Sequence, residues 1–358
     1  MSLSIGIVGL PNVGKSTLFN LLTNNDILAA NYPFATIEAN TGIVPVPDKR
    51  LKVLADIYKA PKIIPATVTF IDIAGLVAGA SKGEGLGNKF LANIRQCDAI
   101  AHVVRAFSDS NILHVENRVD PKKDIEIINT ELILADIQTI ENRLPKLQKE
   151  AKANPKKRAE LEYLNSLLKT LENGTPLSKL EELNYDYIKD LHLLSAKPVI
   201  YIFNVDESTM ADDNKKVELE NLVKPNKATF ICAKLEEELK DLSEEEVMEL
   251  LESYGVKETG LDQVIHAAYD ILGLQSYLTA GDKEIHAWTI KKGWTAPQSA
   301  GVIHTDFEKG FIAASIISYP DLVEAGSEQA VKATGKVRTE GRDYVMQPDD
   351  ICDFRFNV

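Results

Sequence analysis

A glycine-rich segment near the start of the chain, residues 9–16, has residue types and spacing that suit phosphate binding. Its sequence, GLPNVGKS, matches G-x-x-x-x-G-K-S and lies between an apolar run and a helical pattern. Glycines let the backbone approach a phosphate closely, so that several N–H groups converge on it at the start of the helix. We expect Lys15 to reach the β- and γ-phosphates of a nucleotide and the Ser16 hydroxyl to bind Mg²⁺. The alternative, a glycine-rich turn with an exposed lysine, is disfavoured by the flanking pattern. The predicted nucleotide contacts are Asn12, Val13, Gly14, Lys15, Ser16 and Thr17.

A second motif, Asp72-Ile73-Ala74-Gly75, follows an apolar run at residues 67–71. An aspartate at the C-terminal end of a parallel strand suits a contact to Mg²⁺ through water, and the glycine N–H can sense the γ-phosphate. Thr36, in the loop-like stretch between the two motifs, could complete the magnesium coordination, with an ordinary loop threonine as the alternative. Gly75 therefore joins the predicted nucleotide contacts, and the predicted metal ligands are Ser16, Thr36 and Asp72.

The segment Asn204-Val205-Asp206-Glu207 is the candidate reader of the base. GTP-binding proteins have N-K-x-D here, with the lysine stem stacked on guanine and the aspartate accepting two hydrogen bonds. In this chain Val205 replaces the lysine, and Glu207 places its carboxylate one methylene farther out. Sites that read hydrogen bonds reject the wrong base because they leave polar groups unpaired. We therefore predict base contacts by Asn204, Val205 and Glu207 and a preference for ATP, with a surface turn and a base read elsewhere as the alternative. Residues 231–234, ICAK, lie where GTP-binding proteins have a second base-contacting loop.

The group that orients the attacking water differs from that of ordinary GTPases. Many of them place a glutamine directly after D-x-x-G, whereas this chain has Leu76, whose side chain forms no hydrogen bonds. His114 lies in a polar loop after a predicted strand, and a neutral imidazole with a pKa near working pH could orient water. The predicted catalytic residues are therefore Lys15 and His114, with a loop histidine bonded to backbone as the alternative for His114. His102, within the strand, is predicted to be a core residue.

The elements that must position these residues alternate between short apolar runs and longer helical patterns. The alternation indicates βαβ units around a mainly parallel sheet, and therefore an α/β fold. Valine- and isoleucine-rich runs followed by glycines favour strands over buried helices. The predicted strands are 4–8, 42–46, 67–71, 99–105, 198–203 and 228–232, and a helix is predicted at 17–22.

Between about residues 124 and 195 the pattern changes to two heptad seams. The first seam contains Ile133, Ile137, Ile140, Leu144 and Leu147. The second contains Leu161, Leu164, Leu168 and Leu171. A turn at Asn154-Pro155 would bring the two helices together as an antiparallel hairpin with facing seams. Six cations lie near its tip, with Glu150 among them: Lys146, Lys149, Lys152, Lys156, Lys157 and Arg158. They suit either a solvated face or a contact to an anionic partner.

Composition narrows the class of protein. The chain has 44% apolar and 26% charged residues, no apolar run long enough to span a bilayer, and no leader-like N-terminus. Three scattered cysteines suit a reducing compartment, so we expect a cytoplasmic protein without a membrane partner. The net charge of −13 argues against a general nucleic-acid coat, and no DNA partner is expected.

Three stretches, NYPFATIEAN, DIAGLVAGASKGEGLGNKFL and AWTIKKGWTAPQSAGVIHTDFEKGFIAA, extend the comparison beyond the phosphate motif. With them, the chain resembles the YchF branch of the Obg-like ATPase family, in the translation-factor class of P-loop GTPases. The resemblance runs from Ser4 to Val358. It implies an OBG-type P-loop domain, a coiled-coil insertion and a C-terminal β-grasp-like TGS domain. It also implies N-x-x-E with ATP preferred, and association with the ribosome or its RNA.

The predicted domains are 1–125 with 195–278 for nucleotide binding, 126–194 for the helical insertion, and 280–358 for the TGS domain. Pattern alone supports only a small mixed domain at the C-terminus. The function predicted from the sequence is a Mg²⁺-dependent ATPase that acts as a nucleotide-dependent switch. A GTPase of the same superfamily and a nucleotide-gated binding module with incidental hydrolysis are the alternatives.

Overall fold

The computed structural model describes residues 3–23, 40–73, 85–107, 119–240, 242–253, 256 and 258–357. These residues form two compact units. The first contains 3–23, 40–42 and the described residues from 69 to 272, and the second contains 43–68 and 273–357. No helix within the described ranges combines the length and the apolar character needed to cross a bilayer.

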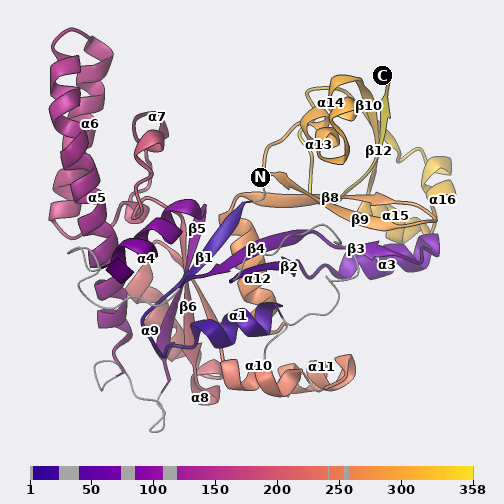
Figure 1. The fold of residues 1–358 in the computed structure, drawn as a ribbon. Helices are drawn as coiled ribbons and strands as arrows, with labels where there is room; N and C mark the ends of the chain where they lie inside the picture. Colours follow the sequence, from indigo (N-terminus) through magenta and orange to yellow (C-terminus); the bar gives the residue numbers. More distant parts are fainter. Residues whose placement is uncertain are drawn as a thin grey trace. The chain divides into compact units, whose positions relative to one another are not determined.

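The first unit is built on a six-stranded sheet in the order β2-β4-β1-β5-β6-β7 (Figure 1). The strands are β1 (Ser4–Val8), β2 (Thr41–Pro45), β4 (Thr67–Asp72), β5 (Ala99–Ala106), β6 (Val199–Val205) and β7 (Lys227–Ile231). The pairs from β4 through β7 are parallel. Every residue of β1 and β6 is buried, as expected for a parallel sheet between two layers of helices. The predicted α/β fold is confirmed, and all six predicted strands are found within one or two residues.

Helices connect these strands and leave the carboxyl ends of the strands free for loops. They are α1 (Lys15–Thr23), α4 (Gly85–Gln96), α8 (Glu207–Met210), α9 (Asp213–Val223), α10 (Ala233–Leu239), α11 (Glu244–Ser253) and α12 (Gly260–Ile271). Short polar side chains mark several starts. Asp206 accepts a hydrogen bond from the Thr209 N–H at α8, and Thr259 accepts one from Asp262 at α12.

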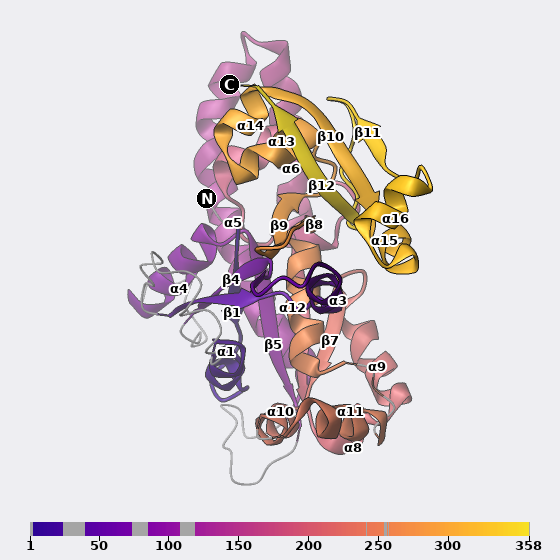
Figure 2. The same ribbon diagram turned by 90° about the vertical axis from the view of Figure 1, so that its right-hand side faces the viewer.

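The insertion is a helical hairpin of α5 (Pro121–Ala151) and α6 (Pro155–Glu172), which lie side by side in both ribbon views (Figures 1 and 2). Asn154 caps α6 by accepting from the Lys156 N–H, and Pro155 follows at the first helical position. The two predicted seams pack into one core with fully or partly buried side chains. The hairpin prediction is therefore confirmed. The chain returns to the sheet through η2 (Leu177–Lys179), α7 (Tyr185–Ile188) and η3 (Lys189–Leu191).

The second unit has its own mixed sheet in the order β11-β10-β12-β8-β9-β3. The strands are β3 (Ile63–Ile64), β8 (Leu274–Ala280), β9 (Ile285–Lys291), β10 (Phe311–Ser318), β11 (Arg338–Glu340) and β12 (Asp350–Phe356). Its helices are α3 (Lys49–Tyr58), α13 (Ala296–Ile303), α14 (Thr305–Lys309), α15 (Tyr319–Ala325) and α16 (Glu328–Ala333). Figure 2 shows α13 and α14 against one side of β10 and β12. Ala296 and Ala300 of α13 share a buried core with Tyr277.

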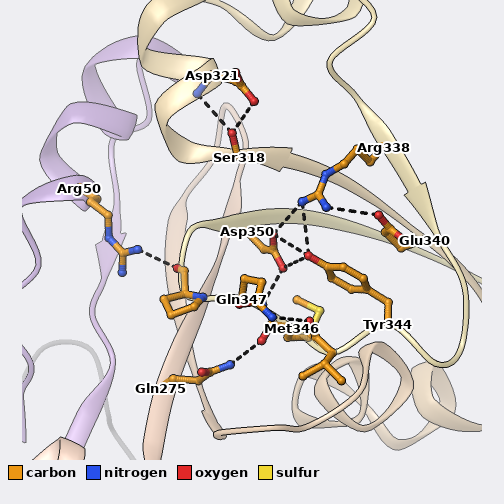
Figure 3. Close-up of polar contacts among 12 residues, drawn as sticks. Arg50, Gln275, Ser318, Asp321, Arg338, Glu340, Tyr344, Met346, Gln347 and Asp350 are labelled. Carbon is orange, nitrogen blue, oxygen red and sulfur yellow. Dashed lines mark hydrogen bonds and ion pairs between the residues drawn. The ribbon is translucent and has the colours of Figure 1, made fainter.

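Residues 43–68 group with this second unit although residues 43–45 and 67–68 at their ends belong to β2 and β4 of the first sheet. Strand β3 pairs with β9 in parallel, and the Leu51 and Leu54 side chains of α3 are buried. Arg50 donates to the Asp349 carboxylate at 2.9 Å and to the Pro348 carbonyl at 2.7 Å, the contact drawn in Figure 3. The boundaries predicted for the three domains stay predictions, and they place this segment in the nucleotide-binding domain.

A polar cluster around Asp350 fixes the turn before β12 (Figure 3). The Asp350 carboxylate, 1% exposed, accepts from the Tyr344 hydroxyl at 2.9 Å and the Gln347 N–H at 2.8 Å. Arg338 donates to it at 3.2 Å. Burial raises the pKa of Asp350, and these donors oppose the rise. The cluster satisfies a buried carboxylate and is therefore structural.

Candidate nucleotide site

The backbone of the glycine-rich loop explains why its residue types are needed. Gly14 has φ +100°, and Asn12 has φ +61°, a left-handed conformation that asparagine tolerates better than most residues. A Cβ added at Gly14 would lie 2.5 Å from Nδ2 of Asn204. Glycine at this position therefore allows both the backbone conformation and the close approach of the loop to β6.

Lys15 is the first residue of α1 and is only 7% exposed. Its Nζ donates to the Leu10 carbonyl at 2.7 Å, which holds the ammonium across the loop. Burial lowers the pKa of Lys15, and the nearby Asp72 carboxylate opposes that shift. A buried ammonium whose main acceptor is a backbone carbonyl is well suited to exchange that carbonyl for a phosphate oxygen.

Asp72 ends β4 beside the start of α1. Its Oδ2 lies 3.4 Å from the Ser16 hydroxyl oxygen, a long hydrogen bond. Its buried Oδ1 has no hydrogen-bond partner within the described ranges. Burial raises the pKa of Asp72, while Lys15 and Ser16 lower it. A buried carboxylate oxygen without a donor, next to a hydroxyl, fits a hard divalent cation that binds oxygen.

The described ranges contain no cluster of three or more His, Cys, Asp or Glu side chains able to hold a metal. An ion at Ser16 and Asp72 would therefore take its remaining ligands from other groups. Mg²⁺ usually binds in this way, through one or two protein oxygens, waters and substrate phosphates. The donor set present here fits that ion.

A cavity of about 690 Å³ opens beside the loop, within the size range of small-molecule sites. Its walls come from the glycine-rich loop and from the loops after β5, β6 and β7. These loops lie at the carboxyl ends of parallel strands, where ligands of such sheets bind. The lining residues are Asn12, Gly14, Thr17, Phe107, Asn204, Val205, Asp206, Glu207, Ser208, Cys232, Ala233, Lys234 and Glu237.

Asn204 joins three walls of the cavity. Its Nδ2 donates to the Val13 carbonyl at 3.1 Å, and its Oδ1 accepts from the Ala233 N–H at 3.3 Å. The residue is 5% exposed, so both ends of its amide are used inside the protein. Asn204 therefore links the end of β6 to the glycine-rich loop and to the loop after β7.

The next two predicted base readers differ from each other in exposure. Val205 lines the cavity but is only 2% exposed, so it presents no long stem to a base. The Glu207 side chain is 42% exposed, and its Oε1 lies 3.0 Å from Nζ of Lys234. The structure thus places the Glu207 carboxylate, which the sequence predicts to read the base, at the cavity and in an ion pair.

The structure brings together most of the predicted site. Six of the predicted nucleotide contacts line the cavity: Asn12, Gly14, Thr17, Asn204, Val205 and Glu207. Thr36, Gly75, Leu76 and His114 lie outside the described residues. His102 is 2% exposed, and the centroid of its ring lies 5.1 Å from that of Tyr201. Burial lowers the pKa of His102 to about 3. It is a core residue, as the sequence indicates.

Sequence reasoning missed Phe107, Ser208 and Glu237 as lining residues. Phe107 directly follows β5, and the Arg105 guanidinium lies 4.5 Å from its ring centroid. Its position after a parallel strand was the available signal. Glu237 lies one turn into α10, and no pattern in the sequence distinguishes it from the other acids of that helix.

The hairpin tip is the second candidate surface. Lys146, Lys149, Lys152, Lys156 and Arg158 are exposed and Lys157 is half-buried. Part of the charge is offset, because Lys157 pairs with Glu160 at 2.5 Å and Arg143 reaches both Glu150 and Glu160 at 3.2 Å. The tip is therefore a cationic surface with a small acidic network at its base.

Comparisons with known proteins cover the whole chain. A family profile described as a 50S ribosome-binding GTPase matches residues 4–143, and the YchF-GTPase C-terminal profile, described as a protein of unknown function, matches 274–357. The Ribosome-binding ATPase YchF of Bacillus subtilis is 50% identical over 369 residues, covering 100% of both chains. That of Haemophilus influenzae is 50% identical over 363 residues with the same coverage. The solved structure of the Schizosaccharomyces pombe YchF GTPase has a TM-score of 0.87 and 40% identity, covering 99% of this chain and 98% of that one.

Proposed function

Because this chain belongs to the YchF family, we propose that it is a Mg²⁺-dependent ATPase, hydrolysing ATP to ADP and phosphate, that acts as a nucleotide-dependent switch on the ribosome. The fold and the glycine-rich motif are those of the P-loop GTPase superfamily. Relatives 50% identical over their full length have the name ribosome-binding ATPase. The observation that carries the proposal is the cavity between the glycine-rich loop and the segment Asn204–Glu207, with the buried Lys15 beside it.

The roles of Lys15, Ser16 and Asp72 are proposed from their motifs and their positions in the structure, and those of Thr36, Gly75 and His114 from the sequence alone. Lys15 would bind the β- and γ-phosphates, and backbone N–H groups of the loop would bind the same oxygens. Ser16 and Asp72, together with Thr36, would hold Mg²⁺. When bound there, Mg²⁺ would supply positive charge that stabilises the negative charge on the phosphates. Gly75 would sense the γ-phosphate, and His114 would orient the attacking water.

The preference for ATP over GTP rests on Val205 and Glu207. Neither the stacking lysine stem nor the shorter carboxylate of the guanine reader is present. Competition of labelled ATP by unlabelled GTP and by unlabelled ATP, on purified protein, tests the preference. ATP should displace the label at lower concentration. Equal or tighter displacement by GTP would overturn the preference and favour the GTPase alternative.

A second candidate function is a binding module in which nucleotide orders the protein and hydrolysis is incidental. Leu76 favours it, because this residue replaces the glutamine that orients water in many GTPases. Multiple-turnover release of phosphate separates the candidates. Sustained release dependent on Lys15 supports the ATPase, whereas release limited to one turnover supports the binding module.

The proposed partner is the ribosome, with ribosomal RNA as the contacted component and the hairpin tip as the contact. Cations gathered on a protein with a net charge of −13 would present this tip, rather than the rest of the surface, to a phosphate backbone. Neither DNA nor a membrane is a proposed partner. Ribosome association would place the protein in the cytoplasm.

A further inference from the structure

The carboxylate expected to read the base is already bound to a cation. Nζ of Lys234 lies 3.0 Å from Oε1 of Glu207 and 4.0 Å from Oε1 of Glu238, one turn farther along α10. Both Lys234 and Glu207 line the cavity, from the loops after β7 and β6. The ion pair therefore joins two walls of the proposed base pocket.

The backbone on both sides of this pair is fixed. The Ala233 N–H, next to Lys234, donates to Asn204, whose amide in turn donates to Val13. On the other side, Asp206 accepts from the Thr209 N–H and the Ser208 hydroxyl at the start of α8. These contacts hold the backbones of the two residues close together, so that the exposed side chains of Lys234 and Glu207 can reach each other across the cavity.

The ion pair between Lys234 and Glu207 affects the recognition of guanine and of adenine differently. Guanine presents its N1–H and its 2-amino group as adjacent donors, and it is recognised by a carboxylate that accepts from both. Adenine has no such pair of donors, since its N1 is an acceptor. An ammonium that holds one Glu207 oxygen removes part of the acceptor capacity that guanine requires and removes nothing that adenine requires.

We infer that Lys234 is a specificity-determining residue: its ion pair with Glu207 keeps the carboxylate from serving as a guanine reader and so lowers the affinity for GTP relative to ATP. The inference rests on the proposed function and names the residue that supports its preference for ATP. Oδ1 of the neighbouring Asp206 accepts two hydrogen bonds at the start of α8, so this carboxylate is held at the helix end. The Glu207 carboxylate also raises the pKa of Lys234, so the ammonium stays charged.

The test compares Lys234→Met with Lys234→Arg, measuring dissociation constants for ATP and GTP with Mg²⁺ on full-length protein. ATP and GTP have the same charge, so their ratio cancels any general effect of losing a cation near the phosphates. Lys234→Met should tighten GTP relative to ATP by roughly threefold to fivefold, the range that an exposed ion pair supports. Lys234→Arg, which retains the charge, should stay near the parental ratio. Lys240→Met, at the end of the same helix and outside the cavity, is the matched control and should leave the ratio unchanged.

A double-mutant cycle with Glu207→Gln isolates the pair. Without the carboxylate, the step from Lys234 to Met should no longer change the ratio. If the parental protein prefers ATP and Lys234→Met leaves the ratio unchanged, the inference is overturned and the proposed function stands. If the parental protein binds GTP as tightly as ATP, the proposed preference itself fails. A change that persists in the Glu207→Gln background would assign the effect of Lys234 to something other than this pair, and would also overturn the inference.

Discussion

The glycine-rich loop and the hairpin tip both present lysines, but in opposite environments. Lys15 is 7% exposed, donates to one backbone carbonyl and lies near the half-buried carboxylate of Asp72. Lys146 at the tip has a side chain that is 77% exposed and a carboxylate only at 4.0 Å. The first lysine has one geometry imposed by packing, whereas the second remains surrounded by water.

The environment of each lysine determines how its charge acts on a bound anion. A buried ammonium acts at short range in a region of low dielectric, so its removal eliminates a specific contact. Exposed cations act together through a potential that salt screens over about 10 Å at 0.1 M ionic strength. We therefore expect the loop to respond to single substitutions and the tip to respond only to several at once and to salt.

The largest effect is expected for Lys15→Ala. Removing the ammonium that is proposed to bind the β- and γ-phosphates should abolish measurable phosphate release and greatly weaken triphosphate binding. Colorimetric phosphate release and nucleotide titration would measure both. Lys89→Ala, an exposed lysine on α4, is the control and should behave as the parent. A variant that is folded by circular dichroism and hydrolyses ATP at the parental rate would contradict the role of Lys15.

His114→Ala comes next, with turnover slowed on the order of 10–10³-fold and nucleotide affinity nearly unchanged. This pattern is expected when a contact made only in the transition state is lost. Stopped-flow binding beside steady-state hydrolysis measures the two quantities. His266→Ala, a half-exposed imidazole on α12, controls for the loss of any histidine. Unaffected turnover would mean that another group orients the water.

Replacing all six tip cations by Glu or Gln should reduce ribosome binding at low salt roughly tenfold or more, because counterion release depends on the number of neutralised phosphates. Co-sedimentation with ribosomes over a series of salt concentrations measures the loss and the slope. ATP hydrolysis without ribosomes should stay at the parental rate, which separates the tip from the loop. If co-sedimentation is unchanged, the tip is a solvated end, and the next residues to test are Lys291, Lys292 and Lys309.

The smallest effect concerns Glu236, a buried acid for which no ion pair is found within the described ranges. It is 4% exposed and accepts from the Gly260 N–H at 2.7 Å, and burial raises its pKa to about 7. A carboxyl whose pKa is higher in the folded state binds its proton more tightly there. Its contribution to stability is therefore greatest below about pH 4.5 and falls as the pH rises to about 7.

Glu236→Gln should remove this dependence. Relative to the parent, the variant should gain about 1–3 kcal/mol of stability between pH 5 and pH 8. Urea unfolding at both pH values measures the change, with the exposed Glu237→Gln as the control. An equal pH dependence in parent and variant would show that Glu236 does not titrate in this range.

Local patterns were enough to predict a large part of this protein. The strand and helix around residues 9–16 follow from an apolar run, glycines and a helical pattern that lie within one short stretch. The two seams of the hairpin follow from heptad spacing, because side chains three and four residues apart share one helix face. Lys15, Ser16 and Asp72 were predicted because phosphate and magnesium binding restrict both residue type and spacing.

Only the tertiary structure showed which segments far apart in the sequence contact each other. No sequence pattern indicates that residues 43–68 pack with the C-terminal sheet, because the pairing of β3 with β9 joins positions more than 200 residues apart. The same holds for Lys234 and Glu207, whose contact exists because β6 and β7 are neighbours in the sheet. The sequence by itself determined which residues make up the proposed phosphate site, because they lie in one loop and at one strand end. The folded chain determined the proposed base pocket, because the residues that line it come from four loops that only the order of the strands brings together.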